Sequence, residues 1–480
     1  MKFKGKILVV GCGVVARCTI PLLLKHIEVD PQNITIMDMY DYRPHVSEAL
    51  KKGVNYIVDT ITKENLNERL TGLISGGDLL MDLSTNIDSL DMLDWCHKNN
   101  VLYINAAIET WDCLHIENKN SPSERTLYHR QMEIRKMVQG WRNKGATAVL
   151  DHGANPGLVS HFTKTGIIDI ANKIIMENTD EKRAACMREA MDAGDFAKMA
   201  QLMNLKTVHI SERDTQITNQ PKTVNEFVNT WSIAGFYEEG IAPAEMGWGT
   251  HERRLPKYAH VHGYGPGNQI CLARMGIRTW VRSLVPSGEI IGMVIRHGEA
   301  FTISDSLTVW EGQKPVYRPT VHYAYCPCDC AVNSLHELEM RQFKLQEKQR
   351  IMTDEIISGK DELGVLLMGH DYKSWWVGSI LDIEESRRLV PHQNATTLQV
   401  ACSLIGAILW MIENPWEGLK VPDDLPHEKI LEFAKIYLGT FVSTEIDWTP
   451  LKNRMNLFEG YNGGNIDEED TWQFDAFLVE

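Results

Sequence analysis

The first 150 residues alternate short apolar runs with longer stretches of helical pattern. The runs that predict buried strands are residues 6–10, 34–38, 78–84, 101–105 and 146–150. Helical patterns lie between or beside them at 21–26, 88–98 and 128–141. Because this alternation is typical of a parallel sheet with crossover helices, the segment 1–150 is predicted to be an α/β domain of the Rossmann type.

After residue 150 the pattern changes to turn-rich sequence with short β-branched runs at 207–210, 289–295 and 300–303. These runs predict a second, α+β region over 151–320. Two helical patterns follow, at 331–348 and 399–412, and the second is apolar enough to be buried. We expect 321–480 to complete the site and to be able to pack back on the first domain.

Composition narrows the class of protein. The chain has 480 residues and a formal net charge of −15, which disfavours a general nucleic-acid surface. No apolar run is long and uninterrupted enough to predict a membrane span. Ten cysteines without paired spacing suit a reducing compartment. We therefore expect a cytoplasmic protein with no nucleic-acid or membrane partner.

A glycine motif stands where the first strand passes into the first helix. Gly11 suits the tight turn, Gly13 admits a pyrophosphate, and Ala16 lets the helix approach the strand, with Val14 and Val15 opening the helix. At the end of the next strand lies a carboxylate, Asp38, which can accept the ribose hydroxyls and would repel a 2′-phosphate. The motif predicts NAD as cofactor, bound by Asp38 and by the loop residues Gly11, Gly13, Val14, Val15 and Ala16. The alternative is a tight turn in an α/β fold without a nucleotide.

Polar residues also follow the later strands of this domain, at the sheet edge where a dinucleotide binds. Ser84 and Thr85 follow one strand, and Ala106 opens the segment 106–109 after the next. Asn155 lies in a turn after the last strand and could hold substrate or the cofactor ribose. Ordinary turn residues are an equal alternative for each, and Asn155 could instead cap the helix that Pro156 begins.

Acids and tryptophans dominate the sequence from 209 to 249. Glu212, Trp231 and Glu239 are of the types that attract and neutralise an ammonium group, although packing is the ordinary role of a tryptophan. His297 could pass protons near neutral pH or be a satisfied structural histidine. The spacing of Cys326, Cys328 and Cys330 differs from a zinc knuckle, and we predict no metal site.

Several long strings resemble one family closely, and together they extend over nearly the whole chain. They occupy residues 153–157, 209–216, 228–232, 243–250, 317–320, 322–325 and 361–367. In these strings the chain is similar to the bacterial homospermidine synthases, which are saccharopine dehydrogenase-like enzymes. The triple-cysteine string at 326–330 is not part of the resemblance.

The resemblance implies an NAD-dependent aminobutyl transfer from putrescine or spermidine to putrescine, with release of ammonia or 1,3-diaminopropane. The amine is oxidised to an imine, exchanged for a second amine and reduced again, with NAD retained. It also implies a homodimer, with 151–320 as the substrate and dimerisation domain. By the same resemblance Glu212, Trp231, Glu239 and His297 are catalytic, whereas Asn155, Asp361 and Glu109 bind substrate.

Two other functions fit the same sequence. A related NAD-dependent amine or amino-acid dehydrogenase would release NADH at each turnover, and Arg213 and Arg296 could hold an α-carboxylate. A dinucleotide sensor without catalysis would tolerate the loss of Trp231 or Glu239.

Overall fold

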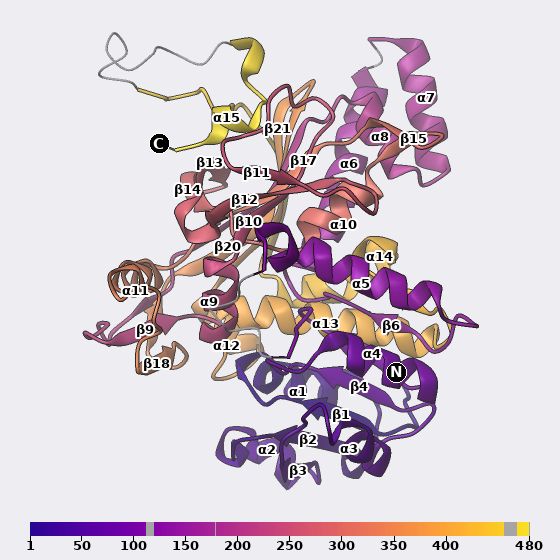
Figure 1. Cartoon of the computed structure of the whole chain (residues 1–480), viewed down its shortest axis with the longest axis vertical. Helices are drawn as coiled ribbons and strands as arrows, with labels where there is room; N and C mark the ends of the chain where they lie inside the picture. Colours follow the sequence, from indigo (N-terminus) through magenta and orange to yellow (C-terminus); the bar gives the residue numbers. More distant parts are fainter. Residues whose placement is uncertain (112–119, 178, 456–467, 480) are drawn as a thin grey trace.

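Two sheets and one long apolar helix between them organise the chain (Figure 1). The computed structural model describes residues 1–111, 120–177, 179–455 and 468–479. The first sheet lies at the bottom of Figure 1 and the second above it, with helix α13 (Ala395–Glu413) crossing the middle. Because α13 contacts strand β5 of the first sheet and β20 of the second, it joins the two halves.

The first sheet has seven strands, all paired in parallel. In spatial order they are β22 (Leu419–Lys420), β6 (Ala148–Val149), β5 (Leu102–Asn105), β4 (Leu79–Asp82), β1 (Ile7–Val10), β2 (Ile34–Asp38) and β3 (Asn55–Val58). Strands β1, β4 and β5 are buried along their whole length, as expected for a sheet covered on both faces. The predicted N-terminal α/β domain with a parallel sheet is confirmed.

One strand of this sheet comes from the far end of the chain. β22 pairs in parallel with β6, so that Leu419 lies beside Ala148 and Lys420 beside Val149. The backbone N–H of Thr147 also donates to the carbonyl of Pro415 at 2.9 Å. The C-terminal region thus packs on the first domain, while the domain limits at 150 and 320 stay a prediction.

The second sheet has ten strands and is mixed. Along its main path lie β11 (Ala259–Val261), β12 (Gln269–Met275), β10 (Pro243–Gly247), β17 (Thr320–Cys326), β7 (Thr207–Asp214), β20 (Lys360–His370), β21 (Lys373–Asp382) and β23 (Thr440–Ile446), and β14 (Gly288–Met293) joins β17 to β13 (Trp280–Val285). The central pair, β17 and β7, is parallel and places Tyr325 beside Glu212. Three small two-stranded sheets pair β15 (Val309–Glu311) with β16 (Lys314–Tyr317), β18 (Lys348–Ile351) with β9 (Glu226–Asn229), and β19 (Ile356–Ser358) with β8 (Ile217–Thr218).

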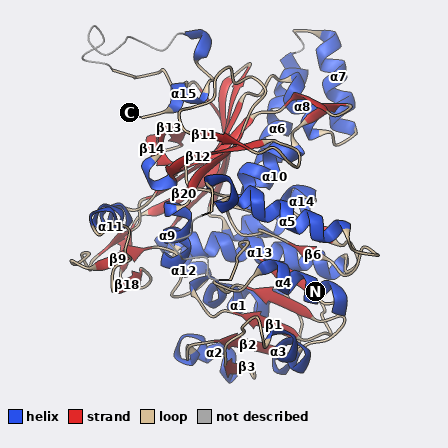
Figure 2. Ribbon diagram, in the orientation of Figure 1, coloured by secondary structure: helices blue, strands red, loops and turns tan. Residues whose placement is uncertain are grey.

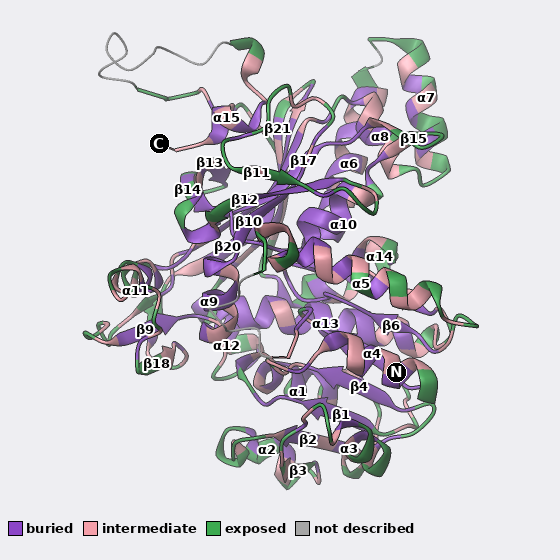
Figure 3. Ribbon diagram, in the orientation of Figure 1, coloured by how far each residue is buried: buried purple, intermediate pink, exposed green. Residues whose placement is uncertain are grey.

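Helices cover both sheets, as the blue ribbons of Figure 2 show. Those of the first half are α1 (Val14–His26), α2 (Ser47–Lys51), α3 (Leu66–Leu73), α4 (Ser89–Asn99) and α5 (Leu127–Gln139). The second half contains α6 (Leu158–Glu177), α7 (Glu181–Asp192), α8 (Phe196–Leu202), α9 (Ile233–Ile241), α10 (Gly298–Ser306), α11 (Asp329–Met340), α12 (Ile383–Leu389), α14 (His427–Ala434) and α15 (Phe474–Phe477). Figure 3 shows α13 and the central strands of both sheets as buried, whereas α7 has an exposed outer face.

The expectation that no apolar run is long enough for a membrane span is wrong for one helix: in the part of the chain that the structure describes, α13 alone is long and apolar enough by length and composition. Within its most hydropathic window, 78% of the residues are buried inside the protein. It packs against α1 and α14 as a core helix, which agrees with the buried helix predicted at 399–412.

Two predicted elements are wrong. The run 300–303, taken for a strand, lies inside helix α10, because it is buried all round and short apolar runs do not distinguish strand from helix. The helix predicted over 331–348 ends at Met340. Gln342 and Phe343 adopt left-handed backbone angles, with φ of 56° and 60°, and they end the helix before strand β18 begins.

Candidate functional site

The glycine loop between β1 and α1 has the shape that a diphosphate needs. Gly11 has a φ of +91°, and a β-carbon there would lie 2.4 Å from the carbonyl oxygen of Leu83, so that only glycine fits. A β-carbon at Gly13 would meet nothing within 4 Å, which leaves open space at the start of α1. Ala16 lies in the first turn of α1 and is fully buried. These residues fit a dinucleotide whose phosphates approach the helix N-terminus.

The carboxylate of Asp38 lies beside the same loop. One of its oxygens accepts the Cys12 N–H at 2.6 Å and the other accepts the Tyr40 N–H at 2.8 Å. The side chain is therefore held by backbone at the end of β2, with lone pairs left over for ribose hydroxyls. Burial raises the pKa of the neighbouring Cys12 thiol to about 11, so the loop carries no thiolate.

Ser84, Thr85 and Ala106 lie at the same edge of the sheet as the glycine loop, since β4 pairs with β1 and β5 with β4. The Ser84 hydroxyl donates to Asp82 at 2.6 Å. Ala106 follows β5 and packs on the turn 153–157, where a β-carbon on Gly153 would lie 3.7 Å from its own. This contact brings the cofactor edge next to the turn that carries Asn155.

A second cluster is built around Tyr323 on β17. Its phenol donates a hydrogen bond to the carboxylate of Glu212 on β7. The Asn155 amide donates to the same carboxylate at 2.8 Å and also contacts the Tyr323 hydroxyl. The ring of His297 lies with its centroid 4.4 Å from that of Tyr323. Since α6 begins at Leu158, Asn155 is not used as the helix cap that was its alternative role.

His297 lies between two carboxylates. Its Nε2 is 3.1 Å from Glu239 on α9, and its Nδ1 is 3.4 Å from the fully buried Glu299. Burial alone would lower the pKa of His297, but the two carboxylates raise it well above its usual range. The two carboxylates therefore favour the protonated, positively charged form of His297.

The indole of Trp231 stands beside this cluster. Its Nε1 donates to the Tyr325 hydroxyl at 3.0 Å, and the rings of Tyr323 and Tyr325 stack with centroids 5.3 Å apart. The structure thus brings together Asn155, Glu212, Trp231, Glu239 and His297, which the sequence predicted separately. The two tyrosines connect them.

Behind Glu212 lie further buried acids. Asp361 on β20 is the register partner of Asp214 on β7, and the Thr396 hydroxyl donates to Asp361 at 2.6 Å. Burial raises the pKa of Glu212 to about 7 and, with the charges of Glu212 and Asp214, raises that of Asp361 well above its usual range. Such a group of acids is poised to accept a cation, since an ammonium would offset their mutual repulsion.

Glu109 follows β5 and is buried rather than open to solvent. Burial raises its pKa to about 8, and the charge of Glu238 adds to the shift while Arg130 and Arg296 oppose it. It therefore belongs to the charged group between α5, α9 and α10, one step behind Glu239.

Three residues of the cluster have no role in the sequence prediction: Tyr323, Tyr325 and Glu299. The tyrosines alternate along β17, a period that marks one face of a strand. Glu299 follows His297 at the start of α10, where a carboxylate is favoured by the helix N-terminus. Only the long-range pairing of β17 with β7 shows that the tyrosines meet Glu212.

Three free thiols lie where β17 passes into α11: Cys326 ends the strand, Cys328 caps the helix and Cys330 lies in its first turn. Burial raises the pKa of each, so none is a thiolate at neutral pH. Over the described ranges, no group of three or more His, Cys, Asp or Glu side chains is arranged to hold a metal ion.

Comparison with known proteins gives one consistent result. Residues 7–149 match the saccharopine dehydrogenase NADP binding domain, and residues 153–444 match the saccharopine dehydrogenase C-terminal domain. Homospermidine synthase of Blastochloris viridis is 38% identical over 486 residues, with 100% of this chain and 98% of that protein covered. That of Mesorhizobium japonicum is 36% identical over 483 residues, with 99% and 96% covered. The crystal structure of homospermidine synthase from Legionella pneumophila in complex with NAD has a TM-score of 0.87 and 37% identity, with 100% of this chain and 99% of that one covered.

Proposed function

The chain belongs to the saccharopine dehydrogenase family, and from that premise we propose that it is an NAD-dependent homospermidine synthase. It would transfer an aminobutyl group from putrescine or spermidine to putrescine, releasing ammonia or 1,3-diaminopropane. Full-length likeness to homospermidine synthases supports this reaction, and so does the NAD in one of their structures.

One structural observation carries the proposal: among the described residues of the cluster next to the cofactor edge, buried carboxylates and aromatic rings surround a single cationic side chain, His297. Tyr323 binds Glu212, whose charge acts on Asp361, and the ring of Tyr323 also contacts His297, which pairs with Glu239. A diamine has an ammonium at each end and needs a carboxylate for each. The arrangement suits such a substrate better than one with a negative charge.

When bound, NAD supplies reversible oxidation of an amine carbon to an imine, which makes an otherwise poor leaving group exchangeable. The protein has to hold the substrate and move protons around that step. Glu212 accepts a proton from the reacting ammonium or binds it, with Asn155 and Tyr323 fixing its carboxylate. His297 can protonate the departing amine, and Glu239 holds a remote ammonium. Trp231 offers its ring face to the cationic centre.

The amino-acid dehydrogenase alternative depended on Arg213 and Arg296. Arg213 lies on the face of β7 that is turned to β13 and β14, and its guanidinium contacts Ser287 at 3.4 Å. Glu212, the adjacent residue, faces the opposite way. Arg296 is buried and bonded to Glu238. Neither arginine is placed to bind the α-carboxylate of a substrate in the cluster.

The reaction itself is the test. Purified protein would be incubated with putrescine and a catalytic amount of NAD, and the products separated by mass. Homospermidine in large excess over NAD supports the proposal. NADH that accumulates with no coupled polyamine indicates the simple dehydrogenase, whereas NAD binding with no turnover indicates the dinucleotide sensor.

We infer also that the protein works as a homodimer in the cytoplasm. Free thiols throughout the described residues fit a reducing compartment. Light scattering on the eluted protein measures the mass of the assembly, and a monomer at micromolar concentration contradicts the dimer.

A further inference from the structure

Two consecutive pairs of charged residues link α9 to the start of α10. Glu238 is bonded to Arg296, and the next residues along each segment, Glu239 and His297, form the second pair. The first pair is buried, whereas Glu239 in the second is partly open. The buried pair therefore stands directly behind the pair that we assign to substrate.

A third charge reaches the buried pair from the nucleotide-binding half. Arg130 on α5 donates through Nη2 to the same Glu238 oxygen at 2.6 Å and through Nη1 to the Ile108 carbonyl at 2.7 Å. Ile108 follows β5, two residues after Ala106 at the cofactor edge. The guanidinium of Arg130 thus spans the cofactor edge and α9 with two hydrogen bonds.

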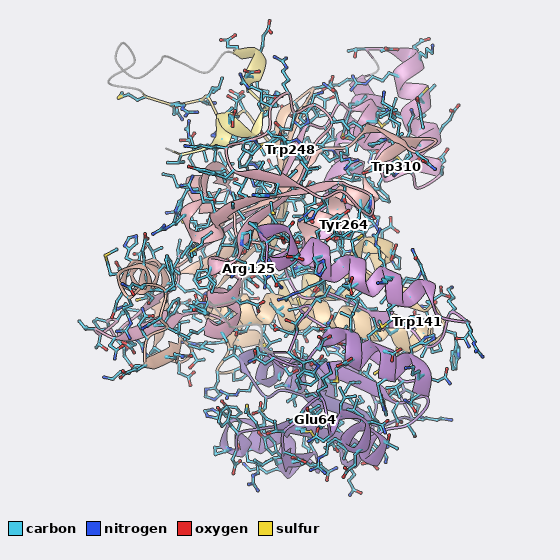
Figure 4. All side chains as sticks on the ribbon, in the orientation of Figure 1. Glu64, Arg125, Trp141, Trp248, Tyr264 and Trp310 are labelled. Carbon is cyan, nitrogen blue, oxygen red and sulfur yellow. The ribbon has the colours of Figure 1, made fainter. Side chains whose placement is uncertain are left out.

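The helix that carries Arg130 is itself fixed to the second sheet. The carboxylate of Glu245 on β10 accepts the N–H groups of Leu127 and Tyr128 at 3.0 and 3.3 Å. Arg296 also donates to the carbonyl of Arg125, which Figure 4 labels near the middle of the molecule. The start of α5 is therefore a fixed point from which Arg130 extends.

We propose that Arg130 is a positioning residue, which clamps Glu238 and so fixes the neighbouring Glu239, with His297, at the correct distance from the cofactor edge. We call the contacts among Arg130, Glu238 and Arg296 the clamp. A carboxylate between two guanidinium groups is held in one geometry, because each contact is charge-assisted and shielded from water. Glu238 and Glu239 are consecutive residues of the short, nine-residue helix α9. A shift of Glu238 therefore moves Glu239 with it.

This inference rests on the proposed function for its kinetic part and on the fold alone for its structural part. The variants are Arg130→Gln, which removes the charge, and Arg130→Lys, which keeps the charge but cannot span both acceptors. The matched control is Arg135→Gln, because Arg135 lies on the same helix and also pairs across to α10, with Asp305, but away from the cluster.

Kinetics and hydrogen exchange then test the clamp together. We expect Arg130→Gln to lower kcat/KM for putrescine by about tenfold or more through displacement of Glu239, with NAD affinity within about twofold of wild type. Arg130→Lys should recover part of that loss, and Arg135→Gln should lose little. Backbone amides of α9, measured by deuterium exchange, should exchange faster in Arg130→Gln than in Arg135→Gln.

The outcomes separate the two proposals. If wild type makes no homospermidine but Arg130→Gln still loosens α9 selectively, the clamp stands and the proposed function falls. If wild type is active and Arg130→Gln matches Arg135→Gln in both kinetics and exchange, the clamp is wrong and the function stands. Should Arg130→Gln fail to fold, Arg130→Lys decides: an α9 exchange rate and kcat/KM equal to wild type would overturn the clamp.

Discussion

The indole nitrogen of Trp231 donates a hydrogen bond to the Tyr325 hydroxyl at 3.0 Å. Tyr325 in turn stacks on Tyr323, which binds Glu212. The orientation of the indole is therefore set from the same strand that orients the carboxylate. A cation held by Glu212 would lie close to an aromatic surface that cannot rotate freely.

The first prediction concerns Trp231. A desolvated cation–π contact contributes about 2 kcal/mol, or roughly thirtyfold in rate or affinity. Trp231→Phe should keep part of this contribution, because phenylalanine still offers a ring face to the cation. It should lose the rest, because its quadrupole is weaker and it cannot donate to Tyr325. Trp231→Ala should lose more, since it also opens the cluster to water. Homospermidine formation per folded enzyme is the measurement.

The competing interpretation is that Trp231 is a core residue, since it packs on Phe236 with ring centroids 5.4 Å apart. It predicts a lower melting temperature and full specific activity in the folded fraction. Trp416→Phe is the control, because Trp416 is 58% exposed. A Trp231→Ala protein that folds normally, binds NAD and turns over like the control would rule out the cation site.

The sequence predicts the first half of the fold well, and the reason is physical. Buried parallel strands are continuous apolar runs, and the turn at Gly11 and the acid Asp38 have fixed places relative to them. The strand β22 could not be foreseen, because Leu419–Lys420 is two residues long and pairs with β6 across more than half of the chain. A pattern of local periodicity contains no such partner.

The candidate site shows the same division. Glu212, Trp231 and Glu239 could be selected for their chemistry, but not the geometry that joins them. That geometry depends on the parallel register of β17 with β7, which sets Tyr325 against Glu212. Asp38 and Asn155 are predicted from their positions at strand ends. Glu299 was missed because a single glutamate at a helix start has an ordinary explanation.

Asp38 provides the second prediction. Asp38→Ala removes the acceptor for the ribose hydroxyls and the charge that repels a 2′-phosphate, so NAD should bind about tenfold or more weakly and the preference over NADP should narrow. Titration of cofactor-free protein with NAD and NADP measures both. Glu48→Ala is the control, since Glu48 is exposed and paired with Lys51. An unchanged ratio of the two affinities contradicts the role given to Asp38.

The third prediction tests retention of the cofactor during turnover. Putrescine that carries deuterium on both carbons bonded to nitrogen should give homospermidine that keeps all of its deuterium, in the presence of excess unlabelled NADH. The reason is that the deuterium removed in oxidation returns to the same carbon before the cofactor leaves. Mass spectrometry of the product is the measurement. Loss of one deuterium per product molecule would show that reduced cofactor exchanges with the bulk.

Glu212 gives the last prediction, a dependence on pH. Burial raises its pKa to about 7, although the hydrogen bonds from Tyr323 and Asn155 oppose the shift. Only the ionised form can neutralise an ammonium, and it is gained as pH rises through about 7. We therefore expect kcat/KM for putrescine to rise across that pH, and Glu212→Gln to lose most activity together with this inflection.

The same pKa has a consequence for stability. In the unfolded chain the acid ionises near 4.5, so between about 4.5 and about 7 the folded protein holds a proton that the unfolded chain has lost. The contribution of Glu212 to stability thus falls as pH rises through this window. The melting temperature of Glu212→Gln relative to wild type should therefore increase as pH rises from about 4.5 to about 7.

Glu252→Gln is the matched control for both measurements. Burial also raises the pKa of Glu252 to about 7, but this residue binds Thr320 and the Phe474 N–H near the C-terminal helix, away from the cluster. Its replacement should change the pH dependence of stability and leave the inflection in kcat/KM in place. If Glu252→Gln removes the inflection, or Glu212→Gln keeps it, the proton that governs turnover does not belong to Glu212.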